Sequence, residues 1–331
     1  MRAVVIGGCG FIGSHLVDSL LKDGHSVLIV DNLSTGSLTN IQQHQENNNL
    51  EILKIDITID KEALKDALVD AEFVFHLAAL ADIVPSVENP EKYFKANVVG
   101  TLNVLEAVKA HGKIKKFIYS ASSSCYGLPE NFPTKETDLI SPMYPYALTK
   151  KMGEDLVLHW GELYKIPVIS LRFFNVFGPR SRTKGTYGAV FGVFLAQKLA
   201  GKAFTVVGDG KQSRDFTFVT DVVDAIVMAS KSKKENEVYN IGSGNHYSIL
   251  RLVELLGGEI EFIPKRPGEP DCTFADISKI RKGIGWCPKV DFEKGIEIML
   301  ENIDNWASAP VWSSKDIERE TKAWFEALKE K

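Results

Sequence analysis

Tyr146 and Lys150 are the residues of this chain whose types and spacing best suit acid–base chemistry. Residues four positions apart share one face of a helix, so the phenol and the ammonium can converge on one ligand. An ammonium about 4 Å away, at an effective dielectric near 20, contributes about 4 kcal/mol, or roughly three pKa units. That could bring the pKa of a phenol from about 10 toward neutrality, where it is a useful general base. An ordinary surface pair would show the same motif, so a second signal is needed.

The helix that must carry this pair is introduced by Pro142 and Pro145 and ends before Pro167. Apolar residues within it recur at spacings of four and three, which predicts a buried stripe on one face. The stripe consists of Leu148, Met152, Leu156, Trp160 and Leu163.

A serine block at 120–127 directly follows an expected strand at 117–119. Serines at the carboxyl end of a parallel strand lie where such sheets bind ligands. If the strand continues, Ser122 and Ser124 point to one side and Ser123 to the other. The block also suits a serine-rich turn without function. No histidine and acid partner is recognisable around it in the sequence, so we do not interpret Ser122 as a hydrolase nucleophile.

The segment from Val4 to Asp31 reads as a strand, a glycine turn, a helix and a second strand. Gly7 permits the tight turn, Gly10 lets backbone amides approach a pyrophosphate, and Gly13 allows close helix packing. Asp31 would accept hydrogen bonds from an adenosine ribose and would repel a 2′-phosphate, which predicts NAD rather than NADP. A glycine turn without a ligand is the alternative.

Apolar runs alternate with helix-length segments, which predicts an α/β fold with a Rossmann-like, doubly wound parallel sheet. The runs lie at 3–6, 27–30, 52–55, 73–77, 117–119 and 168–171. From about Asn175, loop signals separate shorter elements and indicate a smaller α/β substrate domain. We expect an NAD-binding domain over 1–174 with about 217–245, where a helix and a strand return to the sheet. The substrate domain then covers 175–216 and 246–331.

Composition narrows the classes of partner. The 331 residues carry 39 basic and 43 acidic side chains, for a net charge of −4, and no basic run suggests nucleic-acid binding. The four cysteines lack paired spacing, so neither a metal site nor a disulfide framework is indicated and buried free thiols are expected. No apolar run is long enough to span a bilayer, and no signal sequence is recognisable, so we expect a cytoplasmic protein without a membrane partner.

Together the motifs resemble the extended short-chain dehydrogenase/reductase family and, within it, nucleotide-sugar epimerases and dehydratases. The resemblance extends over nearly the whole length. Ile6 departs from the threonine that many members carry there. The motifs are Gly-Gly-x-Gly-Phe-Ile-Gly at 7–13, Asp31, Asp56-Ile57, His76-Leu77-Ala78-Ala79, Asn97, the serine block, Tyr146-x-x-x-Lys150, and the segments 171–175, 214–216 and 266–269.

The resemblance implies a catalytic role for three residues. Tyr146 matches the base that removes the proton from the sugar 4-hydroxyl. Lys150 would hold the nicotinamide ribose and lower the pKa of the tyrosine, and Ser122 would relay the proton. Ser124 would be a second polar contact.

It also implies two sets of binding residues. For the arginines among them, solvated surface charge is the alternative. The expected cofactor contacts are Gly7, Gly10, Phe11, Ile12, Gly13, Asp31, Asn32, Asp56, Ile57, Leu77, Ala78, Ala79, Asn97, Tyr146, Lys150 and Phe173. The expected substrate contacts are Ala81, Ser122, Ser124, Asn175, Ala189, Val190, Arg214, Arg266, Glu269 and Thr273.

The residues that follow Ser122 indicate which reaction of the family the chain catalyses. Typical 4,6-dehydratases of the family place Asp-Glu or Ser-Glu at the positions of Ser123 and Ser124, because a carboxylate must take the C5 proton. Sugar-acid decarboxylases also usually carry the glutamate. Serines at both positions favour a 4-epimerase, which oxidises C4 to a ketone and returns the hydride to the other face of the sugar.

Two other functions stay open. The segment 310–325 resembles sugar dehydratases of legionaminic acid-type pathways, which act on GDP- or UDP-N-acetylglucosamine, so dehydration with a base elsewhere is an alternative. A non-catalytic NAD-binding sensor is another, against which the intact Ser122, Tyr146 and Lys150 argue.

The resemblance also bears on the sugar and on assembly. Ala81 and Thr273 stand where strict glucose/galactose epimerases carry bulkier residues, which leaves room for a 2-acetamido group. We therefore expect a UDP-hexose or UDP-N-acetylhexosamine. Helices around 93–109 and 146–164 correspond to those that pair family members into homodimers, with Leu102, Leu105 and Val108 as part of an apolar face. Packing in the core of the same chain is the alternative for these three residues.

Overall fold

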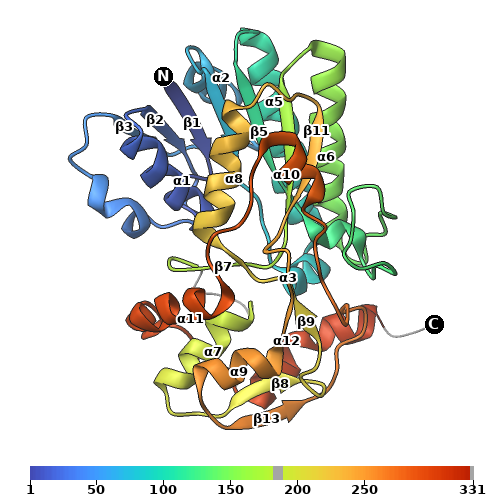
Figure 1. The fold of residues 1–331 in the computed structure, drawn as a ribbon. Coiled ribbons are helices and arrows are strands. Elements are labelled where there is room, and N and C mark those ends of the chain that lie inside the picture. The colour runs from blue at the N-terminus through green and yellow to red at the C-terminus, as the bar shows by residue number, and fades with distance from the viewer. Residues whose placement is uncertain (182–188, 329–331) are drawn as a thin grey trace.

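A seven-stranded parallel sheet forms the centre of the protein (Figure 1). The computed structural model describes residues 1–181 and 189–328. The strand order is β3-β2-β1-β4-β5-β6-β11. The strands β2 and β3 are added on one side of β1 and the later strands on its other side, so the order of the strands reverses between β1 and β4. This confirms the predicted Rossmann-like, doubly wound sheet. The strands are β1 (Arg2–Ile6), β2 (Ser26–Val30), β3 (Leu50–Leu53), β4 (Phe73–His76), β5 (Lys116–Ser122), β6 (Val168–Phe173) and β11 (Glu237–Ile241).

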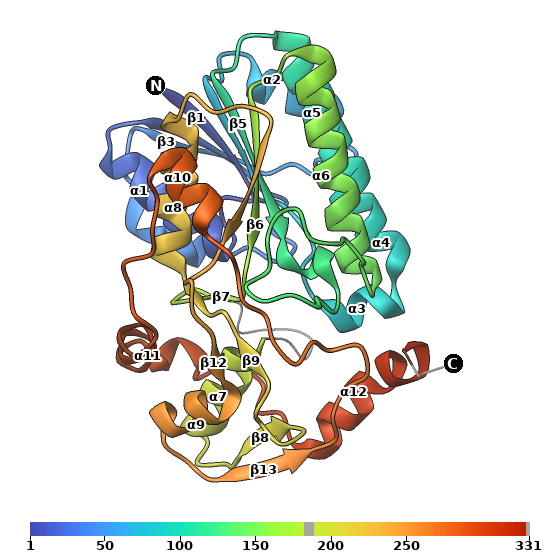
Figure 2. The same ribbon diagram turned by 45° about the vertical axis from the view of Figure 1, so that its right-hand side comes forward.

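Helices cover both faces of this sheet (Figure 2). The helices α1 (Phe11–Lys22) and α8 (Val219–Lys231) pack together on one face. On the other face lie α2 (Lys61–Leu68), α5 (Gly100–His111) and α6 (Pro145–Tyr164). Between α2 and α6 the chain also forms α3 (Ile83–Glu88), α4 (Pro90–Phe94), the π-helix η2 (Lys95–Val99) and the 3₁₀ helix η3 (Ser123–Tyr126). Another 3₁₀ helix, η1 (Leu38–His44), follows β2.

The central strand β1 shows why these strands are apolar throughout. Alternate side chains of a strand point to opposite faces of the sheet. Ala3 and Val5 accordingly belong to the core under α1 and α8, whereas Val4 and Ile6 belong to the core under α2 and α5. A strand that is covered on both faces reads as a continuous apolar run, which is the signal that predicted the sheet.

Two strand predictions needed correction at their ends. The strand expected at 52–55 is β3 at Leu50–Leu53, an edge strand whose partly exposed side chains give a weak apolar signal. The strand before the serines extends to Ser122 and then turns into η3, so the predicted alternation does not continue through Ser123 and Ser124.

The prediction of a buried apolar stripe on α6 was right only in part, because Leu156 and Trp160 pack partly buried against the core under α2 and α5 but the ends of the stripe do not. The helix buries its small and polar residues, among them Gly153, Lys150 and Glu154, against the sheet. Leu148 and Leu163 are 50% and 56% exposed. Gly153 explains the preference, because a Cβ there would lie 2.2 Å from the hydroxyl of the buried Tyr119.

Below the carboxyl ends of the sheet, shorter elements surround a second core (Figure 1). Phenylalanine rings dominate it: Phe177 stacks on Phe191 at 4.7 Å, and Phe216 stacks on Phe292 at 5.2 Å. Its strand pairs are β7 (Val176–Phe177) with β10 (Thr217–Phe218), β8 (Phe204–Val207) with β13 (Ile260–Ile263), and β9 (Ser213–Arg214) with β12 (Tyr247–Ser248). The helices of this region are α7 (Val190–Leu199), α9 (Ile249–Leu256), α11 (Phe292–Glu301) and η4 (Ile303–Trp306), and α10 (Ser278–Ile284) returns to β11.

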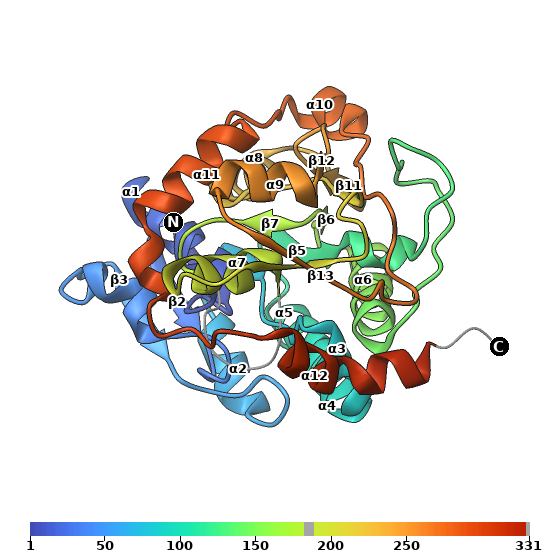
Figure 3. The ribbon, with the colours of Figure 1, turned by 90° about the horizontal axis from the view of Figure 1, so that it is seen from below.

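The last described helix, α12 (Ser314–Ala327), passes beside α3 (Figure 3). Ser313 and Asp316 form a capping box at its start, with reciprocal bonds between side chain and backbone. Ile317, Thr321 and Trp324 are its buried residues. Across 1–181 and 189–328, no helix combines the length and the apolar character that a membrane span requires.

The four cysteines are free thiols. Cys9 and Cys125 are buried, as expected. Cys287 is exposed and Cys272 is half-buried, so the expectation of buried thiols was wrong for these two, which lie in the loop-rich part of the chain.

Candidate active site

A single cleft of about 1980 Å³ runs along the carboxyl ends of the sheet strands and down into the second core. In open parallel sheets, ligands bind at this edge, where the strand order reverses. All the residues predicted to bind cofactor or substrate line this cleft, except Asn97. The sequence therefore located one continuous site from residues that are far apart along the chain.

The glycine turn between β1 and α1 forms a cradle at one end of the cleft. Gly7 has a φ of +87°, and a Cβ there would lie 2.7 Å from the backbone nitrogen of Ala78. A Cβ on Gly13 would lie 2.1 Å from the carbonyl oxygen of Gly7. No side chain caps the start of α1 at Gly10, so the first amides of the helix remain available to an anion. These features fit a pyrophosphate.

Two carboxylates border this end of the cleft. Asp31 accepts backbone N–H bonds from Cys9 (3.0 Å) and Leu33 (2.8 Å), which hold it at the end of β2. Burial raises the pKa of Asp31, and these two bonds oppose that shift. Asp56 accepts a bond from the Asn32 amide at 2.9 Å. The pair fits the ribose and adenine edge of a dinucleotide.

Ser122, Ser124 and Tyr146 come together at the centre of the cleft. The hydroxyls of Ser122 and Ser124 are 2.8 Å apart, and the Ser122 oxygen also accepts the N–H of Ser124. Tyr146 forms a hydrogen bond with Ser122, which lowers the pKa of the tyrosine, but burial outweighs this effect and raises it. The Asp82 carboxylate raises it further. A proton can therefore pass between Tyr146, Ser122 and Ser124 without leaving the cluster.

Lys150 lies one helical turn beyond Tyr146 and is 4% exposed. Its ammonium is 4.4 Å from the centre of the Tyr119 ring, a cation–π contact. Burial lowers the pKa of Lys150 to about 7, whereas the negative charge of Glu154 raises it. Lys150 is not among the groups that shift the pKa of Tyr146. The expectation that Lys150 lowers the pKa of this phenol toward neutrality is therefore not met by the residues of the protein alone.

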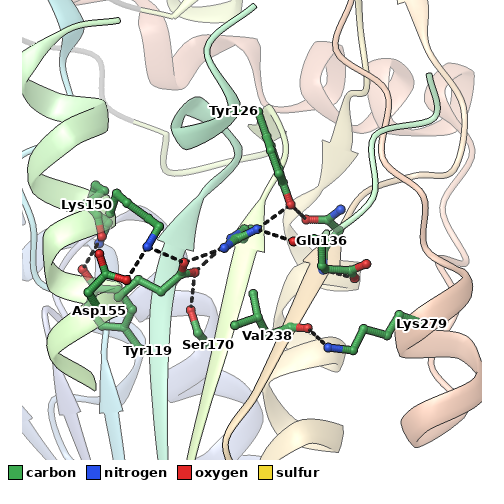
Figure 4. Close-up of polar contacts among 12 residues, drawn as sticks. Tyr119, Tyr126, Glu136, Lys150, Asp155, Ser170, Val238 and Lys279 are labelled. Atoms are coloured by element: carbon green, nitrogen blue, oxygen red, sulfur yellow. Dashed lines mark hydrogen bonds and ion pairs between the residues drawn. The ribbon is translucent and has the colours of Figure 1, made fainter. Parts of the chain in front are cut away.

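A buried ion pair of Arg172 with Glu154 lies among the polar contacts around Ser170 and Tyr126 (Figure 4). Arg172 Nη2 contacts Glu154 Oε1 at 2.6 Å, and Arg172 Nε donates to Glu154 Oε2 at 3.0 Å. Ser170 donates to the same carboxylate at 2.9 Å, and Arg172 donates to the Tyr126 hydroxyl at 2.7 Å. This network joins α6 to β6, so it fixes the helix that carries Tyr146 and Lys150.

Two arginines meet a carboxylate at the other end of the cleft. Arg214 Nη2 is 2.9 Å from Glu269 Oε1, and Arg266 Nη1 is 3.8 Å from Glu269 Oε2. Nearby, the Thr273 hydroxyl donates to Asn175 Oδ1 at 2.7 Å and accepts the N–H of Asp215 at 3.1 Å. Guanidinium groups that face a cleft bind phosphate oxygens well. This end therefore suits a diphosphate.

Asn97 supports the cleft from behind and does not line it. Its amide accepts the N–H of Leu80 at 2.8 Å and donates to the Leu80 carbonyl at 3.0 Å and to the Thr149 hydroxyl at 3.1 Å. These bonds attach the segment after β4 to α6. In this structure Asn97 therefore positions residues that line the cleft, and its contact with the cofactor stays a prediction.

The sequence did not single out three lining residues: Asp82, Tyr144 and Trp324. The Tyr144 ring stacks on the Tyr146 ring with centroids 6.5 Å apart and also contacts Trp324. Tyr144 could have been found from its place two residues before Tyr146. Trp324 lies in the segment 310–325 that resembles sugar dehydratases, but nothing in the sequence placed it at the cleft.

The chain is similar to proteins that act on nucleotide sugars. Residues 4–299 match the family model described as GDP-mannose 4,6 dehydratase. The UDP-glucose 4-epimerase of Mycolicibacterium smegmatis is 36% identical, over 92% of this chain and 99% of its own. UDP-glucuronic acid decarboxylase 2 of Arabidopsis thaliana is 34% identical, over 91% of this chain and 68% of its own.

Solved structures agree with these relatives. The UDP-N-acetylglucosamine 4-epimerase of Methanobrevibacter ruminantium M1 superposes with a TM-score of 0.85 at 36% identity, over 91% of this chain and 98% of its own. The UDP-glucuronic acid 4-epimerase of Bacillus cereus, solved with UDP-glucuronic acid and NAD, superposes with a TM-score of 0.85 at 34% identity, over 92% and 99%. The chain is therefore an enzyme that belongs to the NAD-dependent epimerase/dehydratase family of the short-chain dehydrogenase/reductase type.

Proposed function

We propose that the chain is a nucleotide-sugar 4-epimerase that works through a transient 4-keto sugar with bound NAD. The observation that carries this proposal is the position of Ser122, Tyr146 and Lys150 in one cluster between the glycine cradle and the arginine pair, where Lys150 is buried and the other two are half-buried. Serines at 123 and 124 support epimerisation, since the carboxylate typical of dehydratases is missing at those two positions.

Each residue of the cluster has a separate task. Tyr146 takes the proton from the sugar 4-hydroxyl and later returns it, and Ser122 relays that proton. Lys150 holds the nicotinamide ribose and keeps a positive charge near Tyr146 when it is protonated. The glycine cradle and Asp31 would hold NAD, which would supply the hydride acceptor and donor. Partial burial of Tyr146 strengthens the effect of nearby charges on it.

We propose UDP-hexose or UDP-N-acetylhexosamine as the substrate. Arg214 and Arg266 would bind the diphosphate, while Asn175, Ala189 and Val190 line the cleft beside it. Ala81 and Thr273 also line the cleft, and their small side chains leave room for a 2-acetamido group.

A 4,6-dehydratase is the second candidate, and Asp82 favours it. This carboxylate lines the cleft and is close enough to raise the pKa of Tyr146. It could remove the C5 proton in place of a glutamate after Ser122. The matching family model has the description of a dehydratase.

We also propose two domains: an NAD-binding domain over 1–174 with about 217–245, and a substrate domain over 175–216 and 246–331. Residues 182–188 and 329–331 of the substrate domain lie outside the described residues. A homodimer is proposed through the outer face of α6, where Leu148 and Leu163 are exposed. Leu105 and Val108, which we expected on this interface, are instead buried in the core under α2 and α5, because α5 packs directly on the sheet.

Replacement of Tyr146 by phenylalanine tests the proposal. Tyr146→Phe removes the proton acceptor and keeps the ring, so we expect kcat to fall by about 10²–10⁴-fold while NAD content stays the same. Tyr164→Phe, on the exposed end of the same helix, is the matched control and should keep full activity. A Tyr146→Phe enzyme with normal turnover would contradict the mechanism. A wild-type protein that binds NAD but converts no nucleotide sugar would instead support the sensor.

A further inference from the structure

The C-terminal helix α12 forms part of the wall of the cleft. Trp324 lines the cleft although it is only 4% exposed, and it comes from the last described helix of the chain. The family model ends at residue 299, before α12 begins. This wall therefore lies outside the part of the chain that the family model describes.

Trp324 contacts the segment that carries Arg266 in two ways. Its indole N–H donates to the carbonyl of Pro267 at 2.7 Å, and the Arg266 guanidinium lies 5.9 Å from the centre of its ring. Gly268, with a φ of +69°, lies against the end of the same helix, since a Cβ there would be 3.0 Å from Leu328. The position of Arg266 therefore depends on α12.

The same ring also reaches the catalytic cluster. Trp324 contacts Tyr144 at 6.1 Å between centroids, and Tyr144 stacks on Tyr146 at 6.5 Å. One indole thus touches both the arginine at the diphosphate end and the ring beside the proposed base. Thr321, one turn earlier, donates to the Ile317 carbonyl and is buried, so this part of the helix is fixed against the protein.

We propose that α12 is a substrate-binding element, in which Trp324 is a positioning residue that holds Arg266 for the diphosphate of the nucleotide sugar. This inference rests on the proposed function. It adds a determinant of affinity that lies beyond the shared family region. Loss of a cation–π contact together with a buried hydrogen bond is expected to weaken diphosphate binding by about tenfold.

Calorimetric titration with UDP and with GDP tests this proposal on the full chain with its NAD content measured. We expect Trp324→Ala to raise the Kd of the nucleotide that the wild type binds by about tenfold, with NAD content unchanged. Trp324→Phe keeps a ring but loses the bond to Pro267, so a smaller increase of about threefold is expected. Lys322→Ala, on the exposed face of α12, is the matched control and should bind as the wild type does.

Each outcome decides one question. If Trp324→Ala and Trp324→Phe bind the nucleotide within twofold of the wild type, the role of α12 is refuted and the proposed function stands. If Trp324→Ala does not fold, the threefold change in Trp324→Phe remains the test. If the wild type binds neither UDP nor GDP and converts no nucleotide sugar, the proposed function fails, and this inference fails with it.

Discussion

Removal of Arg172 is the sharpest test of how the fold holds the catalytic helix. Arg172→Met leaves the Glu154 carboxylate, which is 1% exposed, with the Ser170 hydroxyl at 2.9 Å and the Lys151 ammonium at 4.0 Å. The methionine fills similar space without a charge. The variant therefore isolates the effect of an uncompensated buried carboxylate on α6.

The expected cost follows from burial. Removal of one partner of a buried ion pair destabilises a protein by about 3–5 kcal/mol, because the remaining charge stays out of water. At an unfolding entropy of roughly 2.1 cal/mol/K per residue, this chain has about 0.7 kcal/mol/K, so the Tm should fall by about 4–7 °C. The double variant Arg172→Met with Glu154→Gln should recover at least half of that loss, since it buries no unpaired charge.

Thermal unfolding of the wild type, Arg172→Met, Glu154→Gln and the double variant measures the coupling between Arg172 and Glu154 directly. Lys294→Ala, which removes an exposed ion pair with Glu297, is a control that should leave the Tm unchanged. The reasoning is refuted if Arg172→Met lowers the Tm by less than 1 °C. It is also refuted if the double variant falls by the sum of the two single changes.

Two further predictions concern pH and the sugar. His76 is fully buried, and burial lowers its pKa from 6.5 to about 3, so the unfolded chain takes up a proton that the folded protein excludes. The stability that the neutral His76 contributes is complete above pH 6.5 and is lost as the pH falls toward 3, with a loss of about 2 kcal/mol at pH 5. In urea unfolding, the free energy of unfolding of His76→Phe should therefore fall by about 2 kcal/mol less than that of the wild type between pH 7 and pH 5. Thr273→Tyr should reduce kcat/KM for UDP-N-acetylglucosamine at least tenfold more than for UDP-glucose, whereas the control Thr273→Ser should not. Equal losses of kcat/KM on both substrates would reject the acetamido pocket.

The sequence predicted the sheet and the cofactor cradle because both follow from local rules. Val4 and Ile6 alternate with Ala3 and Val5, and a strand that is buried on both faces must be apolar at every position. Gly7 needs a left-handed conformation and Gly13 a close approach to the backbone, which only glycine allows. Such requirements are visible in residue types alone.

The errors arose where another part of the chain decides the outcome. The whole apolar stripe of α6 was expected to be buried, but α6 packs a face of small, polar and apolar residues on the sheet, where Arg172 pairs with Glu154. Trp324 reaches the cleft only because α12 folds back onto the loop at Arg266, a contact that no local pattern encodes.

The central claim is tested most directly by identification of the product. Purified protein is incubated with UDP-glucose, UDP-N-acetylglucosamine or GDP-N-acetylglucosamine without added NAD, and the sugars are analysed by mass spectrometry and NMR. We predict an unchanged mass with an inverted C4 proton for a UDP-sugar, which would establish 4-epimerisation and identify the sugar. Loss of one water would contradict this account and establish a 4,6-dehydratase, with Asp82 as the first residue to test as its base.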